Sequence, residues 1–161
     1  MLTGLALGDL AWLALGAYAF HMMEEYQFNW RDWARAVIGL PVSWSDFYVT
    51  NGIVVVLGIV QAQMAAHVPL MPLVFAALML INATFFHVAP FVWTRGRFSP
   101  GLLSAVVLFY PLGIAIFARA AGDGVLTPGL AIGAFVGGAV LMASPIIFLR
   151  LREKPYFQQT P

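Results

Sequence analysis

Residues 10–25 read LAWLALGAYAFHMMEE, an apolar run that leads directly into His21, Glu24 and Glu25. In a helix, the two glutamates lie three and four residues after the histidine, so the three side chains can share one face. Ionisable groups at membrane depth are costly and are usually functional. One helical turn can therefore present an imidazole and two carboxylates, a set that can bind a divalent metal or move protons.

The composition around this stretch is typical of a membrane protein. Hydrophobic residues make up 61% of the 161 residues and charged residues 9%, against roughly one half and one quarter in soluble domains. The chain has no cysteine, so a metal would have to be held by histidine and carboxylate oxygen. A net charge of +1 offers no basic surface and argues against nucleic acid as a partner, so membrane lipids are the expected surroundings.

Apolar runs separated by polar, Gly or Pro residues predict an all-α, polytopic integral membrane protein. The expected fold is a five-span transmembrane helical bundle that forms one domain over residues 1–161, since each run has about the length of a bilayer core. The predicted spans are residues 3–26, 45–66, 70–93, 102–120 and 128–149.

The positive charges predict the orientation of these spans. Arg119 lies alone on one side, and the other Lys and Arg residues all fall on the opposite side. The positive-inside rule then places the C-terminus in the cytoplasm and the N-terminus outside. The residues on the cytoplasmic side are Arg31, Arg35, Arg95, Arg97, Arg150, Arg152 and Lys154.

Two segments outside the polar cluster have helical patterns of their own. Residues 30–38 predict a short amphipathic helix on the inner membrane surface after the first span, with Trp30 and Trp33 toward lipid. In the last span, three glycines at four-residue spacing clear one face for close packing, within the bundle or in a homo-oligomer. These glycines are Gly129, Gly133 and Gly137.

A helical rise of about 1.5 Å per residue lets polar residues on different spans be compared in depth. His21 and His87 each lie about 9 Å to the cytoplasmic side of the middle of their spans, so the two histidines share one layer. His67 falls in a short outer turn and is expected at the surface, whereas Asp9 is an intramembrane acid with no evident partner. Four further polar residues are expected to support the histidine layer: Asp46, Asn51, Asn82 and Ser104.

Two more patterns accompany the histidine–glutamate run: Asn82-x4-His87 in the third span and Phe98-Ser-Pro-Gly101 before the fourth. With these residues in view, the chain resembles the HXXEE family of small bacterial integral membrane proteins over most of its length. His21, Glu24 and Glu25 take the namesake positions, and Phe98 stands where a tyrosine is expected. The resemblance implies a multi-span helical protein of a bacterial inner (cytoplasmic) membrane and supplies no reaction.

The residues support a membrane-embedded enzyme with a His/Glu site in the inner leaflet. His21, His87 and one or both glutamates would bind Zn or Fe, or would act without metal as general acid and base. A lipid or other apolar substrate would enter laterally, with Arg95 or Arg97 near an anionic headgroup. The alternatives are a non-enzymatic proton- or cation-linked carrier, although the paired repeats expected of a transporter are missing, and a structural membrane subunit.

Overall fold

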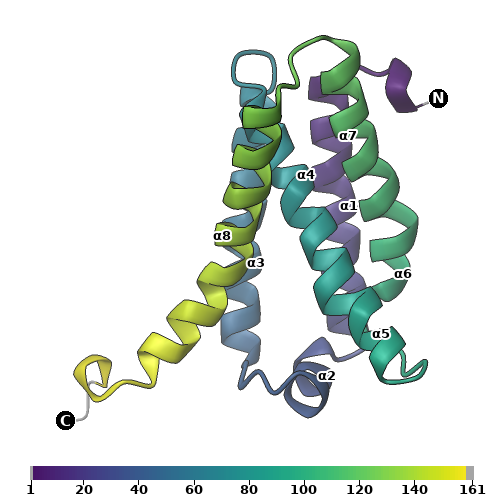
Figure 1. Ribbon diagram of the computed structural model, residues 1–161. Coiled ribbons are helices and arrows are strands. Elements are labelled where there is room, and N and C mark those ends of the chain that lie inside the picture. The colour runs from purple at the N-terminus through teal and green to yellow at the C-terminus, as the bar shows by residue number, and fades with distance from the viewer. Residues whose placement is uncertain (1, 159–161) are drawn as a thin grey trace.

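The computed structural model describes residues 2–158, and every regular element within that range is a helix (Figure 1). The long elements are α1 (Leu7–Gln27), α3 (Trp44–Met64), α4 (Leu70–Asn82) continued by α5 (Ala89–Trp93), α6 (Leu102–Ser104) continued by α7 (Tyr110–Gly122), and α8 (Pro128–Arg152). The π-helical turns η2 (Ala83–Val88) and η3 (Ala105–Phe109) join α4 to α5 and α6 to α7. The short elements are η1 (Leu2–Gly4), α2 (Trp30–Val37) and η4 (Pro155–Phe157).

Four helices within residues 2–158 are long and apolar enough to cross a membrane. The structure thus confirms an all-α protein with several candidate membrane helices. α1 also has 21 residues but carries four ionisable side chains and is not among the four, so the predicted fifth span at 3–26 stays a prediction. The four candidates are Trp44–Met64, Leu70–Trp93, Leu102–Gly122 and Pro128–Arg152.

α4 forms the centre of the bundle, with α8 and α7 packed against it and α1 against α3 and α7 (Figure 1). Small side chains make the closest approach possible. A Cβ on Gly138 of α8 would lie 2.7 Å from the backbone nitrogen of Leu78 in α4, so the two helices meet backbone to backbone at this point. This close packing joins the last helix to the central one.

The predicted glycine face of the last helix lies partly on the same contact. A Cβ on Gly137 would meet the side chain of Val74 at 3.0 Å, and one on Gly133 would meet Leu70 at 3.8 Å, both in α4. A Cβ on Gly129 would meet no atom within 4 Å. Two of the three glycines thus face α4 within the bundle, and the homo-oligomer stays a prediction.

The short helix α2 forms where residues 30–38 predict it, but the expectation that both tryptophans face lipid is wrong for Trp33. Its side chain is only 7% exposed and packs with Ala34 and Val42. The cause is the turn at Gly39, whose φ of +65° reverses the chain so that the following residues cover the helix. Through the buried Trp33 side chain, α2 packs against the segment that leads into α3.

Two ionisable residues lie far from the polar cluster. His67 is exposed in the turn between α3 and α4, which confirms the prediction for it. Asp9 is also exposed and lies in the first turn of α1, where its charge is favourable to the helix dipole. α1 begins at Leu7, and the expectation of an intramembrane acid at Asp9 stays a prediction.

The two ends of the bundle differ in charge. α2, the turn between α5 and α6 and the C-terminal end of α8 lie together at one end, whereas the α3–α4 and α7–α8 turns lie at the other (Figure 1). The arginines predicted to be cytoplasmic belong to the first group, and Arg119 ends α7 at the opposite end. This asymmetry is the one that the positive-inside rule uses.

We predict that Gly138→Ala lowers the free energy of unfolding by about 1–3 kcal/mol, because the new methyl group overlaps the backbone of α4. Gly129→Ala is the matched control: it adds the same methyl group to the same helix, where no atom lies within 4 Å. Its stability should be unchanged or raised by up to about 1 kcal/mol. Unfolding in detergent measures both, and equal stability of the two variants would contradict the backbone contact.

Candidate metal centre

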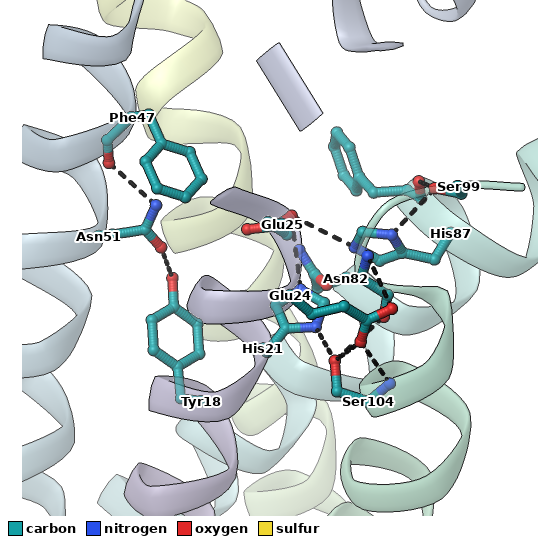
Figure 2. A network of polar contacts seen from close by, with 12 residues as sticks. Tyr18, His21, Glu24, Glu25, Phe47, Asn51, Asn82, His87, Ser99 and Ser104 are labelled. Atoms are coloured by element: carbon teal, nitrogen blue, oxygen red, sulfur yellow. Dashed lines mark hydrogen bonds and ion pairs between the residues drawn. The ribbon is translucent and has the colours of Figure 1, made fainter. Parts of the chain in front are cut away.

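The two predicted site histidines meet in the interior of the bundle (Figure 2). His21 of α1 and His87 of η2 are 1% and 0% exposed, and their ring centroids lie 4.7 Å apart with the rings nearly perpendicular. Glu25, one helical turn after His21, is 6% exposed. Its Oε1 lies 3.5 Å from Nε2 of His21 and 3.6 Å from Nε2 of His87. The predicted common layer of the histidines is thus a direct contact around one carboxylate.

Ser104 fixes the tautomer of His21. Its Oγ lies 2.9 Å from Nδ1 of His21 and donates a hydrogen bond of 2.5 Å to Oε2 of Glu24. A hydroxyl can donate one hydrogen bond, and Ser104 donates its own to the Glu24 carboxylate. In its contact with His21, the Ser104 oxygen must therefore accept a hydrogen bond from Nδ1–H. The neutral imidazole then carries a lone pair on Nε2, the atom that faces Glu25.

Ser99 does the same for His87. Its Oγ lies 3.1 Å from Nδ1 of His87 and donates to the carbonyl of Phe86 at 3.3 Å. That carbonyl is available because Pro90, four residues later, has no N–H to donate to it. Ser99 therefore accepts from Nδ1–H of His87, and Nε2 of this ring is also left with a lone pair.

The three inward-facing atoms form a donor set for a cation. Nε2 of His21 and Nε2 of His87 are buried and have no hydrogen-bond partner, and they lie with a Glu25 oxygen within 4.8 Å of one another. Two lone pairs and a carboxylate that face each other in an apolar interior are costly unless positive charge lies among them. Two imidazoles and one carboxylate are a ligand set used for zinc and for non-haem iron. This group of residues could hold a metal ion.

Glu24 has a different role from Glu25. Its Oε1 accepts hydrogen bonds from the backbone nitrogens of Gly101 and Leu103 at 3.2 and 3.0 Å, and its Oε2 accepts one from Ser104 N at 2.7 Å. The carboxylate thereby satisfies N–H groups at the start of a helix, where negative charge is favourable. Glu24 lies outside the His21–Glu25–His87 group and supports it through Ser104.

Gly101 lies directly against both imidazole rings. A Cβ on this residue would be 2.5 Å from Cε1 of His87 and 2.7 Å from Cε1 of His21, and its φ of +95° is one that side chains disfavour. The turn at Pro100–Gly101 thus shapes the site, because only glycine leaves room for the rings.

Both π-helical turns precede a proline and border the site. η2 contains His87 and is followed by Pro90, and η3 begins after Ser104 and is followed by Pro111. π-helical turns are rare and frequently mark functional sites. The fourth long helix continues through Pro111 after its π-helical turn.

The other predicted supporting residues do not belong to the donor set. Asn51 accepts a hydrogen bond from the Tyr18 hydroxyl at 2.5 Å, and Asp46 pairs with Arg152 at 2.6 Å. Asn82 is 8% exposed, and its amide nitrogen faces the sulfur of Met142 at 3.8 Å. Ser104 alone of the four touches the histidines. Sequence reasoning missed Ser99 and Tyr18, although Ser99 stands in the Phe-Ser-Pro-Gly turn that was singled out.

A cavity of about 500 Å³ leads to the site. It lies among α1, α3, α4 and α8, and most of its wall is apolar. His21 and Glu25 line it, whereas His87 is fully buried and does not. Its size falls within the roughly 300–1,000 Å³ of small-molecule pockets. His21 and Glu25 of the donor set therefore border a space large enough for an apolar ligand.

These features define a helical, membrane-type protein with a buried His/Glu group at the end of a cavity. Residues 12–116 match the family described as "Protein of unknown function with HXXEE motif", and the chain belongs to this family. His21, Glu24 and Glu25 lie within the matched part. No curated protein and no solved structure matches the chain.

We predict that Gly101→Ala destabilises the fold by about 1–3 kcal/mol more than Gly96→Ala, because its methyl group overlaps both histidine rings. Gly96 is a matched control in the same turn, with a φ of +94° and only Phe91 near its Cβ, at 3.9 Å. Backbone strain is common to the two variants, so the difference between their unfolding free energies reports the contact with the histidines. Equal losses would show that the rings can move aside freely.

Proposed function

We propose that the protein is a membrane-embedded enzyme in which His21, Glu25 and His87 hold a Zn or Fe ion and act on a lipid or other apolar substrate. The observation that carries this proposal is the convergence of two unpartnered Nε2 atoms on one carboxylate oxygen. The serine contacts support it, because hydrogen bonds to the second imidazole nitrogen orient and tune metal-ligating histidines.

The proposed setting is a bilayer crossed by five helices, with α1 as the fifth. Leu10, Ala11 and Ala14 of α1 are fully buried, so much of this helix faces protein and does not need to be as apolar as its neighbours. The N-terminus would lie outside and the cationic end in the cytoplasm, in the inner membrane of a bacterium. The His/Glu group then lies in the inner leaflet, since it is near the end of α1 that lies at the cationic end of the bundle.

An ion held by three protein ligands keeps a position open for water or substrate. When bound, it would supply Lewis-acid activation of a substrate group or of water. The chain's own residues would hold the two imidazoles in one tautomer and exclude bulk water with the apolar cavity wall. Without metal, Glu25 and the histidines could still exchange a proton, which is also what a proton- or cation-linked carrier would require.

We predict near-stoichiometric Zn or Fe in the wild-type protein purified without chelators, as measured by elemental analysis. His21→Ala, Glu25→Gln and His87→Ala should each lose the metal, because each removes one of three ligands. His67→Ala, a change at an exposed histidine outside the site, should keep it. A metal-free wild type would overturn the metal proposal. Comparison of lipid extracts incubated with wild type and with His21→Ala then tests catalysis, and identical extracts would favour a carrier.

We further predict that Ser99→Ala weakens zinc binding by about 10–100-fold, because His87 loses the hydroxyl that holds its Nδ1–H. Ser144→Ala is the matched control, since that hydroxyl donates only to the carbonyl of Leu141 within α8. Titration of the metal-depleted proteins against a chromogenic zinc chelator measures both affinities. Unchanged affinity in Ser99→Ala would contradict the role assigned to the serine.

A further inference from the structure

The cavity that reaches His21 and Glu25 has a side open to the surroundings of the bundle, between α3 and α8. Residues on both of these helices line the cavity and are also exposed on the outside: Ile53 is 57% exposed and Phe148 is 67% exposed. In a bilayer, such a side is reached by lipid chains without passing through water. In a bilayer, the cavity is therefore accessible to an apolar chain.

One cationic side chain lines the described part of the cavity, that of Arg152 at the end of α8. It lies at the cytoplasmic end of the opening. Its Nη1 lies 2.6 Å from Oδ1 of Asp46, and its Nη2 lies 3.3 Å from Oδ2. Both nitrogens of the guanidinium fork thus face the two oxygens of one carboxylate, the geometry in which arginine recognises carboxylates. Arg95 and Arg97, which were expected to meet a headgroup, do not line this cavity.

Asp46 does not depend on Arg152 for its hydrogen bonds. Its Oδ2 accepts from the backbone nitrogen of Ser43 at 2.9 Å and from the Ser43 hydroxyl at 2.6 Å, and these contacts cap α3. The ion pair itself is exposed on the arginine side, where such pairs contribute little to stability. The carboxylate of a ligand can therefore replace Asp46 as the partner of Arg152, while Asp46 keeps the hydrogen bonds with Ser43 that cap α3.

We propose that the cavity binds a long-chain fatty acid, with its carboxylate on Arg152 in place of Asp46 and its chain between α3 and α8, past Glu25. Three observations carry this assignment: the apolar chain-sized cavity, its opening between exposed apolar residues, and a guanidinium fork already set to hold a carboxylate at its polar end. The inference rests on the proposed function only in treating the fatty acid as the substrate, because binding does not require the metal.

The test is photolabelling of the purified full-length chain with a hexadecanoic acid that bears a diazirine on its chain, followed by peptide mapping. Saturable labelling of α3 and α8 residues of the cavity is expected, with competition by hexadecanoic acid and little by hexadecanol. Equal competition by hexadecanol would overturn the carboxylate contact. Stronger competition by hexadecyl phosphate than by hexadecanoic acid would overturn the choice of a fatty acid.

Removing the charge of Arg152 or of Asp46 should change the affinity for the fatty acid in opposite directions. An ion pair with only a structural role would not produce this difference. Arg152→Gln should weaken binding by about fivefold or more, whereas Asp46→Asn should strengthen it by about threefold, because it removes a competing carboxylate. Arg150→Gln, a change at a similarly exposed arginine on the same helix, should leave affinity unchanged. Losses of similar size in Arg152→Gln and Asp46→Asn would show that the pair only holds α3 to α8.

A bulky side chain tests the position of the apolar chain. Ile53→Trp narrows the cavity and should abolish specific labelling, whereas Ile59→Trp, on the same helix but outside the cavity, should not. Equal labelling in the two variants would place the fatty acid elsewhere. Ser99→Ala, at a residue that does not line the cavity, should keep fatty-acid labelling while its zinc affinity falls, so failure of the fatty-acid site and failure of the metal site are read separately.

Discussion

The approach of two imidazole nitrogens to one carboxylate oxygen is the interaction on which the rest of this structure depends. All three groups are buried, and hydrogen bonds on the far side of each ring direct a lone pair inward. Such an arrangement is unfavourable without a cation, because buried acceptors need positive charge or a proton among them. The protein nevertheless builds it from two helical segments, α1 and η2, with Glu24 and Gly101 as close supports. We interpret this local conflict as the mark of a functional site.

Proline makes the arrangement possible in an otherwise regular bundle. Pro90 leaves the carbonyl of Phe86 without a backbone donor, and the Ser99 hydroxyl donates its hydrogen bond to that carbonyl. In the same way, the Glu24 carboxylate accepts the hydrogen bond from the Ser104 hydroxyl. Ser99 lies in the turn before α6 and Ser104 in α6 itself, so this short segment sets the tautomers of two histidines that come from different helices. The cavity, whose wall is mostly apolar, borders two members of the group, His21 and Glu25.

Much of this could be predicted from the sequence, since long apolar runs and helical rise are regular. The shared depth of His21 and His87 follows from counting residues. Counting could not separate Glu24 from Glu25, because neighbouring residues on a helix point 100° apart and only the packing of α6 decides which one faces inward. It also missed the burial of Trp33, which depends on a turn, and the cavity between α3 and α8, which depends on how two distant helices diverge.

The most direct test of this account is ¹⁵N NMR of the protein labelled in its histidines, before and after addition of zinc. The account predicts that His21 and His87 are both neutral Nδ1–H tautomers, and that zinc shifts the Nε2 resonances of these two residues while that of His67 stays unchanged. A proton on Nε2 of either ring, or resonances that do not respond to zinc, would contradict the claim that the two lone pairs are set to bind a metal.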